Sequence, residues 1–211
     1  MSRFINKNHP IPLSGELSEI LRESRTQIRD LQAENKQLKQ ELQRMAVYRS
    51  MAYRDALTGL YNRRYFDERL REECARSIRV DSYPFGIILV DLDDFKVIND
   101  AYGHPIGDLA LCTVGEQLLE HIREVDILCR FGGDEFAILL PATNAEGCQL
   151  VMRRLRSIPI SNHDLPTPIG LSIGGATCPP GPHTATELLD RADADMYREK
   201  RRRKLLSSSK L

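Results

Sequence analysis

Apolar residues repeat every seven positions near the start of the chain. One line of this repeat carries Leu17, Ser24, Leu31, Leu38 and Met45, and the other carries Leu21, Ile28, Asn35 and Leu42. So narrow a stripe over four heptads favours a coiled coil, and a lone amphipathic helix packed on its own domain is the alternative. One polar seam residue, Asn35, favours a parallel pair in a single register. The pattern predicts a parallel dimeric coiled coil over residues 17–50, after a flexible segment at 1–16.

The pattern changes after residue 50 to short apolar runs that alternate with helical periodicity. Helical spacing predicts helices over residues 64–79, 111–125, 145–156 and 186–204. Apolar runs predict strands over residues 85–90, 127–131, 136–140 and 168–177. Two of these strands flank Gly132-Gly133, which predicts a β-hairpin. The fold class is therefore α/β, an α+β sandwich with a mixed central sheet and flanking helices over residues 51–205, followed by a flexible tail at 206–211.

Composition narrows the setting. Apolar residues make up 41% of the 211, which supports a buried core, and 30 basic residues balance 30 acidic ones. The zero net charge gives no indication of a nucleic-acid or acidic-membrane partner. A basic-zipper DNA binder is excluded because residues 1–16 hold only Arg3 and Lys7 as basic residues.

The cysteines and apolar runs indicate the compartment. Five scattered cysteines without a CxxC pair indicate reduced thiols. The longest apolar run, residues 85–90, is far shorter than the ~20 residues that span a bilayer. No apolar segment of a secretory signal stands at the N-terminus. We therefore expect a cytoplasmic protein without a membrane partner, and any membrane sensor would lie outside this sequence.

Carboxylates gather at a strand end and at the hairpin turn. Asp91 closes the central apolar strand, and Asp134 and Glu135 follow the Gly-Gly pair. Unpaired charge at the end of a buried strand is costly, so these residues do not serve stability. Converging carboxylates suit Mg²⁺, and two such ions ~4 Å apart can activate a hydroxyl and stabilise a leaving phosphate. An acidic, solvated turn is the alternative for these residues.

Neighbouring residues point to a purine nucleotide. Gly132 and Gly133 leave room for a nucleotide against the backbone and allow positive φ, although a plain hairpin turn explains them equally well. Lys96 lies just beyond the Asp91 strand end and can meet a phosphate. Asn99 and Asp108 offer groups for a purine edge. A carboxylate accepts hydrogen bonds from N1–H and the 2-amino group of guanine, and adenine lacks both donors.

Five ordered segments resemble the GGDEF domain family, the diguanylate cyclases. These segments are residues 55–64 (DALTGLYNRR), 91–108 (DLDDFKVINDAYGHPIGD), 130–136 (RFGGDEF), 172–174 (SIG) and 192–197 (ADADMY). The resemblance covers about residues 51–204. It implies a sheet like the palm of nucleotidyl cyclases and polymerases, and an enzyme that condenses two GTP into cyclic di-GMP. It also implies a homodimer with one GTP half-site in each protomer.

The resemblance assigns roles to matching positions. The metal and catalytic positions are Asp91, Leu92 (through its carbonyl), Asp134 and Glu135, with two Mg²⁺ or Mn²⁺ ions. The GTP-binding positions are Lys96, Asn99 and Asp108, with Lys200 as a second triphosphate ligand. Because adjacent side chains in a strand face opposite ways, we expect Asp134 rather than Glu135 to bind the metal directly.

The resemblance also implies product inhibition. Arg123-Glu-Val-Asp126 matches the family's RxxD motif, which binds cyclic di-GMP, with Arg153, Arg154 or Arg156 as a second arginine. A plain Arg–Asp pair at a helix end is the alternative. The chain departs from the family after Lys200, where a usual Gly is missing and Lys204 stands where an Arg is usual. We expect a solvated basic tail at 201–204.

Two other functions compete with the cyclase. One is a non-catalytic sensor that binds GTP or cyclic di-GMP and signals through the coiled coil. Degenerate family members of this kind usually lose the carboxylates, and this chain retains all three. The second is a cyclase with a mixed or adenine substrate, against which Asp108 argues.

Overall fold

The chain divides into two compact units, Met1–Ala52 and Tyr53–Leu211. The computed structural model describes residues 15–80, 83–178 and 184–208. Most of the predicted flexible segment at 1–16, and the end of the predicted tail, lie outside the described residues. No helix in the described ranges has a stretch both long and apolar enough to traverse a bilayer.

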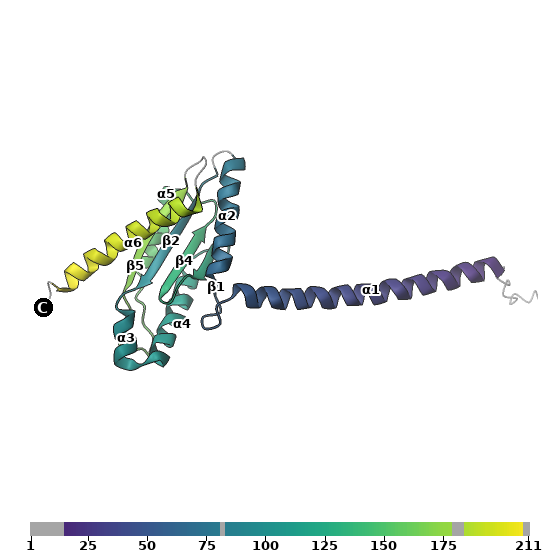
Figure 1. Ribbon diagram of the computed structural model, residues 1–211, viewed down its shortest axis with the longest axis horizontal. Helices are drawn as coiled ribbons and strands as arrows, with labels where there is room; N and C mark the ends of the chain where they lie inside the picture. Colours follow the sequence, from purple (N-terminus) through teal and green to yellow (C-terminus); the bar gives the residue numbers. More distant parts are fainter. Residues whose placement is uncertain (1–14, 81–82, 179–183, 209–211) are drawn as a thin grey trace, which may run out of the picture. The chain divides into compact units, whose positions relative to one another are not determined.

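The first unit is the long helix α1 (Gly15–Tyr53) (Figure 1). The predicted helix over 17–50 is confirmed. Its seam side chains are solvent-exposed, with Ile28 and Leu31 at 52% and Leu38 at 50%. A helix with so narrow an apolar stripe gains most of its stability from packing that stripe on a partner. The parallel dimer remains a prediction.

The second unit is built on a five-stranded mixed sheet with the order β1-β3-β4-β2-β5. The strands are β1 (Tyr61–Asn62), β2 (Phe85–Leu92), β3 (Ile127–Arg130), β4 (Glu135–Leu140) and β5 (Leu171–Cys178). Among these five strands of the described residues, β1 and β3 pair in parallel and the other neighbouring pairs are antiparallel. Both predicted hairpin strands are confirmed, and every residue of β2 is buried, as expected for a central strand.

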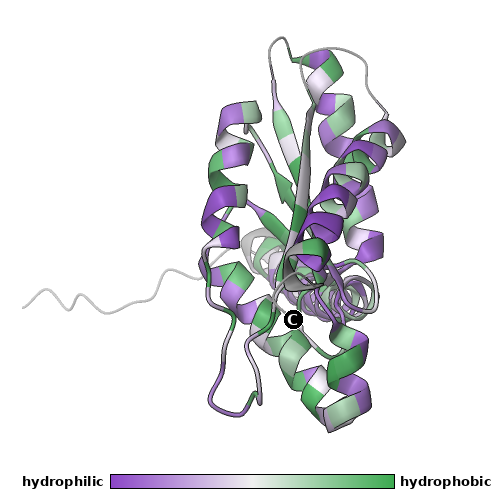
Figure 2. Ribbon diagram, turned by 90° about the vertical axis from the view of Figure 1, so that its left-hand side faces the viewer, coloured by the Kyte–Doolittle hydropathy of each residue, from purple (hydrophilic) through white to green (hydrophobic). Residues whose placement is uncertain are grey.

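Helices cover both faces of this sheet. They are α2 (Arg63–Arg79), α3 (Phe95–Tyr102), α4 (His104–Glu120), α5 (Ala145–Arg156) and α6 (Ala185–Ser208). Side chains alternate along β2, so Ile87 and Leu89 join the core under α2 and α6. Ile88 and Val90 join the core under α3, α4 and α5. Figure 1 shows α6 crossing over β5 and β2, and Figure 2 shows hydrophobic residues concentrated toward the sheet.

Some predicted boundaries were wrong. The helix predicted to reach Val125 ends at Glu120, where the His121 N–H donates to the Leu118 carbonyl at 3.1 Å. In the turn that follows, the Asp126 carboxylate accepts the Arg123 N–H at 2.8 Å. Helix α3 was not predicted, since eight residues give little periodicity. Gly103, at φ 83°, separates α3 from α4, a conformation that glycine adopts without strain. Helix α6 continues to Ser208, three residues into the expected tail.

Candidate active site

The carboxylates of Asp91 and Glu135 belong to strands that pair directly. Asp91 of β2 stands opposite Glu135 of β4 in the antiparallel register. In each strand the residue two positions away, Leu89 or Ala137, packs under α2 and α6. Since every second side chain of a strand points to the same face, Asp91 and Glu135 share that face of the sheet. Asp134 precedes β4, and its carbonyl accepts the Leu92 N–H at 3.2 Å. The structure thus brings together Asp91, Leu92, Asp134 and Glu135.

This register changes the expectation for Glu135. The alternation argument assumed that Asp134 and Glu135 both lie within a strand, but β4 begins at Glu135. Asp134 lies in the turn, where strand alternation does not apply. Glu135 is therefore placed on the same face as Asp91, and Asp134 lies next to them in the turn.

Lys200 of α6 contacts Asp91. Its Nζ donates to Asp91 Oδ1 at 2.6 Å, and the Asp91 side chain is only 9% exposed. Burial raises the pKa of Asp91, and Asp134 and Asp93 add to this against the opposing effect of Lys200. Burial alone would lower the pKa of Lys200, but the bond to Asp91 and the surrounding carboxylates raise it overall. The cluster therefore favours a cation beside Asp91.

Glu135 lies in a strongly negative setting. Burial raises its pKa, and Asp91, Asp134 and Asp193 raise it further, with Lys200 opposing them. Glu135 also lines a cavity of about 400 Å³ between α2, α6 and the strands, together with Asp193 and Met196. Its charge is thus unfavourable in the ligand-free fold.

We expect Glu135→Gln to stabilise the ligand-free protein at pH 7. A raised pKa means that the folded state binds the proton more tightly than the unfolded state. Stability is then lost as pH rises from the ordinary value of 4.5 through the raised one. Removing the charge should raise the melting temperature by about 2 °C at pH 7 and by nothing near pH 4. Thermal unfolding at the two pH values, with exposed Glu116→Gln as control, measures this. A lower melting temperature at pH 7 would contradict it.

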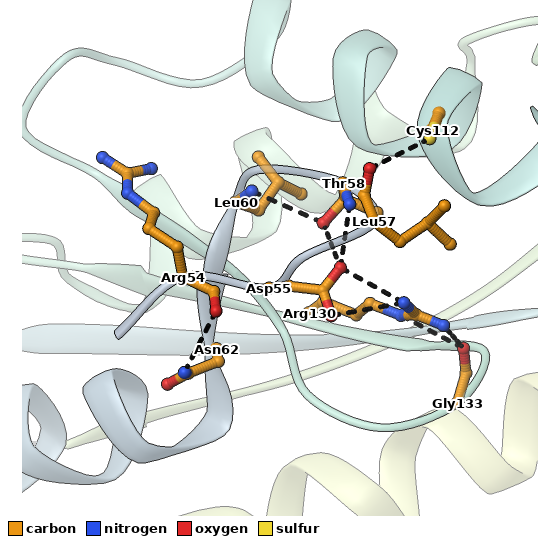
Figure 3. Close-up of polar contacts among 9 residues, drawn as sticks. All are labelled: Arg54, Asp55, Leu57, Thr58, Leu60, Asn62, Cys112, Arg130 and Gly133. Atoms are coloured by element: carbon orange, nitrogen blue, oxygen red, sulfur yellow. Dashed lines mark hydrogen bonds and ion pairs between the residues drawn. The ribbon is translucent and has the colours of Figure 1, made fainter. Parts of the chain in front are cut away.

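A hydrogen-bond network supports the hairpin turn (Figure 3). Arg130 Nη2 donates to the Gly133 carbonyl at 2.8 Å, and its Nη1 donates to Asp55 Oδ1 at 3.2 Å. Thr58 donates to the same carboxylate oxygen from its N–H at 2.9 Å and its hydroxyl at 2.8 Å. Burial opposes ionisation of Asp55, but these bonds outweigh it and lower its pKa. Asp55 and Thr58 lie in the segment 55–64 and Arg130 in the segment 130–136, but the sequence did not indicate this supporting role.

The glycines of the turn do not adopt positive φ, which corrects that expectation. Among glycines of the described ranges, only Gly59 and Gly103 have positive φ. A Cβ on Gly133 would meet no atom within 4 Å, and one on Gly132 would lie 2.7 Å from Glu135 Oε2, at the end of a side chain. Backbone strain therefore does not explain them. They leave the turn open on the side where a ligand could approach.

The corner between α3 and α4 brings Asn99 and Asp108 together. The Asn99 backbone carbonyl accepts the Gly103 N–H at 2.9 Å. A Cβ on Gly107 would lie 1.9 Å from Asn99 Oδ1, so the absence of a side chain there lets Asn99 lie against α4, beside Asp108. Lys96 and Asp108 are exposed and Asn99 is half-buried. The predicted base-binding residues therefore share one corner.

The donor set fits Mg²⁺ bound together with a phosphate ligand. In the described ranges, no three His, Cys, Asp or Glu side chains are arranged to hold a metal by themselves. Mg²⁺ commonly takes one or two protein carboxylates and completes its shell with phosphates and water. Asp91 and Asp134 supply hard oxygens, and the Lys200 ammonium beside Asp91 shows that the cluster accommodates positive charge. Asp91, Asp134 and the Leu92 carbonyl are the residues that would hold the metal.

The RxxD residues lie at the other end of the domain core, by the start of β3. Asp126 is 8% exposed, and its Oδ1 has no hydrogen-bond partner among the described residues. Burial raises its pKa, against the lowering effect of Arg123 and Arg154. Arg156, by contrast, is engaged inward, where its Nη2 contacts Glu199 Oε2 at 2.5 Å. Of the candidate second arginines, Arg154 is the one whose charge acts on Asp126.

The solvated tail expected at 201–204 was wrong at one position. Arg201, Arg202 and Lys204 are exposed, but Arg203 is half-buried and its Nη1 lies 3.1 Å from Asp93 Oδ2. Residues 201–204 are helical, so they turn one side chain toward the sheet. Among the described residues, Cys74, Cys112, Cys129 and Cys148 are free thiols, and burial raises the pKa of Cys74 and Cys148 to about 11.

Similarities to known proteins agree with this arrangement. The family model "Diguanylate cyclase, GGDEF domain" matches residues 52–205. The chain is 40% identical over 155 residues to the bifunctional diguanylate cyclase/cyclic di-GMP phosphodiesterase MucR of Pseudomonas aeruginosa, covering 71% of this chain and 22% of MucR. It is 34% identical over 197 residues to the diguanylate cyclase DgcP of the same species, covering 92% of this chain and 28% of DgcP. The chain thus spans about a quarter of the length of these relatives.

One similar solved structure contains both a coiled coil and a GGDEF domain. The coiled coil and GGDEF domain of DgcB from Caulobacter crescentus, in complex with cyclic di-GMP, matches with a TM-score of 0.68 and 28% identity. The match covers 84% of this chain and 94% of that one. Helix α1 is consistent with a coiled coil of the DgcB kind. With a family match over most of the chain, the protein belongs to the GGDEF domain family of diguanylate cyclases.

Proposed function

We propose that the chain condenses two GTP molecules into cyclic di-GMP and two pyrophosphates. The observation that carries this proposal is the pairing of Asp91 with Glu135, with Asp134 beside them and Lys200 2.6 Å from Asp91. A cluster of this kind suits a triphosphate with its divalent cations. The Asn99–Asp108 corner beyond the same strand supplies groups for a guanine edge.

The residues divide the work of the reaction. Asp108 and Asn99 hold the guanine base, and Lys96 and Lys200 hold the phosphates. Asp91, Asp134 and the Leu92 carbonyl would hold divalent cations, which would neutralise phosphate charge and lower the pKa of the attacking hydroxyl. In each of two steps a 3′-oxygen forms a bond to an α-phosphorus, and pyrophosphate leaves with the broken bridge oxygen. Glu135, whose pKa is raised, is suited to accept the 3′-hydroxyl proton.

Each domain holds half of an active site, so two must face each other. The 3′-hydroxyl of one GTP attacks the other, and then the attack is repeated in reverse. A parallel coiled coil of α1 would hold two domains together and raise their effective concentration. Its register or splay would then control whether the two half-sites align.

Turnover of GTP tests the proposal and its rivals together. Purified protein with GTP and Mg²⁺ should form cyclic di-GMP and pyrophosphate in a 1:2 ratio, and ATP in place of GTP should give no cyclic product. Tight binding of GTP or cyclic di-GMP without any turnover would identify a sensor. Product from ATP at a comparable rate would contradict the role of Asp108.

We also propose that cyclic di-GMP inhibits the enzyme at Arg123, Asp126 and Arg154. The support is the buried Asp126, whose Oδ1 lacks a partner among the described residues, beside two arginines. Arginine pairs bidentately with phosphate, which suits a cyclic dinucleotide.

We expect Arg123→Ala to relieve this inhibition without slowing the initial rate. The guanidinium is exposed, so its loss should leave the fold intact. Progress curves of wild type should slow as product accumulates, and those of the variant should remain linear about tenfold longer. Glu124→Ala, which changes the exposed residue next to Arg123, serves as the control. Equal inhibition of Arg123→Ala and wild type by added cyclic di-GMP would refute this site.

A further inference from the structure

Four charged side chains form one network of ion pairs between α5, α6 and the segment after β2: Arg156, Glu199, Arg203 and Asp93. Lys200 of α6 and Asp91 of β2 form a separate ion pair. The network therefore links the helix that carries Lys200 to the segment that follows Asp91.

Arg203 lies at the centre of this network. Its Nη1 lies 3.1 Å from Asp93 Oδ2, and its Nε lies 3.5 Å from Glu199 Oε1. Glu199 is 8% exposed, and Arg156 holds its other oxygen at 2.5 Å. Because a buried carboxylate left without its cation is costly, these ion pairs favour this geometry.

Asp93 is itself fixed to β5. Its Oδ1 accepts the Ser172 hydroxyl at 2.5 Å, and its N–H donates to the Gly170 carbonyl at 2.9 Å. A Cβ on Gly170 would lie 2.7 Å from Asp93 Oδ2, so glycine leaves room for this carboxylate. The Arg203–Asp93 pair thus ties α6 to the segment two residues beyond Asp91.

Lys200 makes fewer ion pairs than Arg203 in the described ranges. Its side chain is 46% exposed, and its one ion pair in the described ranges is with Asp91. Arg203 bridges two carboxylates with its planar guanidinium, which a lysine ammonium cannot do with the same geometry. Lys200 can therefore exchange its partner while Arg203 keeps α6 in place.

We propose that Arg203, through Asp93 and Glu199, is a positioning residue that holds α6 in register while Lys200 passes from Asp91 to a substrate phosphate. This inference rests on the proposed function, because it assigns the phosphate to GTP. Arg203 was expected to belong to a solvated basic tail, for which no role was predicted. Arg203 itself does not contact the substrate in this scheme.

Binding of a non-reacting GTP analogue tests the proposal. Calorimetry with guanosine 5′-(α,β-methylene)triphosphate and Mg²⁺ should give a Kd about tenfold weaker for Arg203→Ala than for wild type. Arg203→Lys should recover part of this loss, and Arg202→Ala, an exposed neighbour of equal charge, should bind like wild type. In turnover of GTP, Arg203→Ala should raise KM about tenfold and change kcat by less than about threefold.

A second measurement needs no ligand. If Arg203 and Asp93 act as a pair, the losses in melting temperature of Arg203→Ala and Asp93→Ala should not add in the double variant. Additive losses, or analogue binding by Arg203→Ala equal to that of Arg202→Ala, would overturn the positioning role while wild-type turnover still supports the proposed function. A wild type that neither binds the analogue nor converts GTP would instead overturn the proposed function, and this inference with it.

Discussion

Asp134→Ala should abolish cyclic di-GMP synthesis, lowering the rate by about 1,000-fold or more. The Asp134 backbone is tied to Leu92, so its carboxylate is held near Asp91 at the paired strand ends. Removing it takes away a metal-binding oxygen and leaves the backbone arrangement intact. Chromatographic quantification of product from GTP and Mg²⁺ over several hours measures the effect.

Stability data separate lost chemistry from lost structure. Asp134→Ala should melt no lower than wild type without ligand, because the change removes one of several like charges. The matched control is Asp164→Ala, which removes an acid with a 70% exposed side chain outside the cluster and should retain full activity. Retention of more than about a tenth of the activity by Asp134→Ala would contradict a metal-binding role.

Charges placed in the α1 seam should lower activity about 100-fold at nanomolar protein. Leu31 and Leu38 lie in the predicted seam and are about half exposed in the single chain. Replacing both with Asp puts four like charges into a parallel dimer interface, which should separate the half-sites. Because the defect lies in association, specific activity of Leu31→Asp/Leu38→Asp should rise steeply with protein concentration.

The opposite face of α1 provides the control. Ala33→Asp/Gln40→Asp adds the same charges to the same helix at positions that point away from the predicted partner. This variant should remain dimeric in sedimentation and as active as wild type. Deletion of residues 17–45 should behave like the seam variant. A seam variant that is monomeric yet fully active at nanomolar concentration would rule out the need for the coiled coil.

Local pattern predicted much of the fold. Helical periodicity predicted the α5 helix at Ala145–Arg156, a Gly-Gly turn predicted the hairpin, and a continuous apolar run predicted the buried strand β2. The two-residue strand β1 and the eight-residue helix α3 were missed, because such short elements carry little periodicity. They form because neighbouring elements hold them, as β3 holds β1.

The candidate site, like the fold, was predictable from the sequence only in part. Carboxylates at a strand end and a turn could be recognised from their positions, as could residues for a guanine edge. That Glu135 faces Asp91 could not, because it depends on the register between two strands and on where β4 begins. The role of Gly107 beside Asn99 also required the packing of α3 on α4.

The sequence alone determined the types of the longer elements, the long helix with its apolar seam, and the chemical identity of the candidate site. These are properties of residues close together in the chain, where side-chain period and turn preference act directly. Only the tertiary structure decided that Arg203 meets Asp93, 110 residues earlier, and that Arg154 rather than Arg156 acts on Asp126. Such pairings depend on how helices are rotated and seated on the sheet, and that is set by the packing of the whole core.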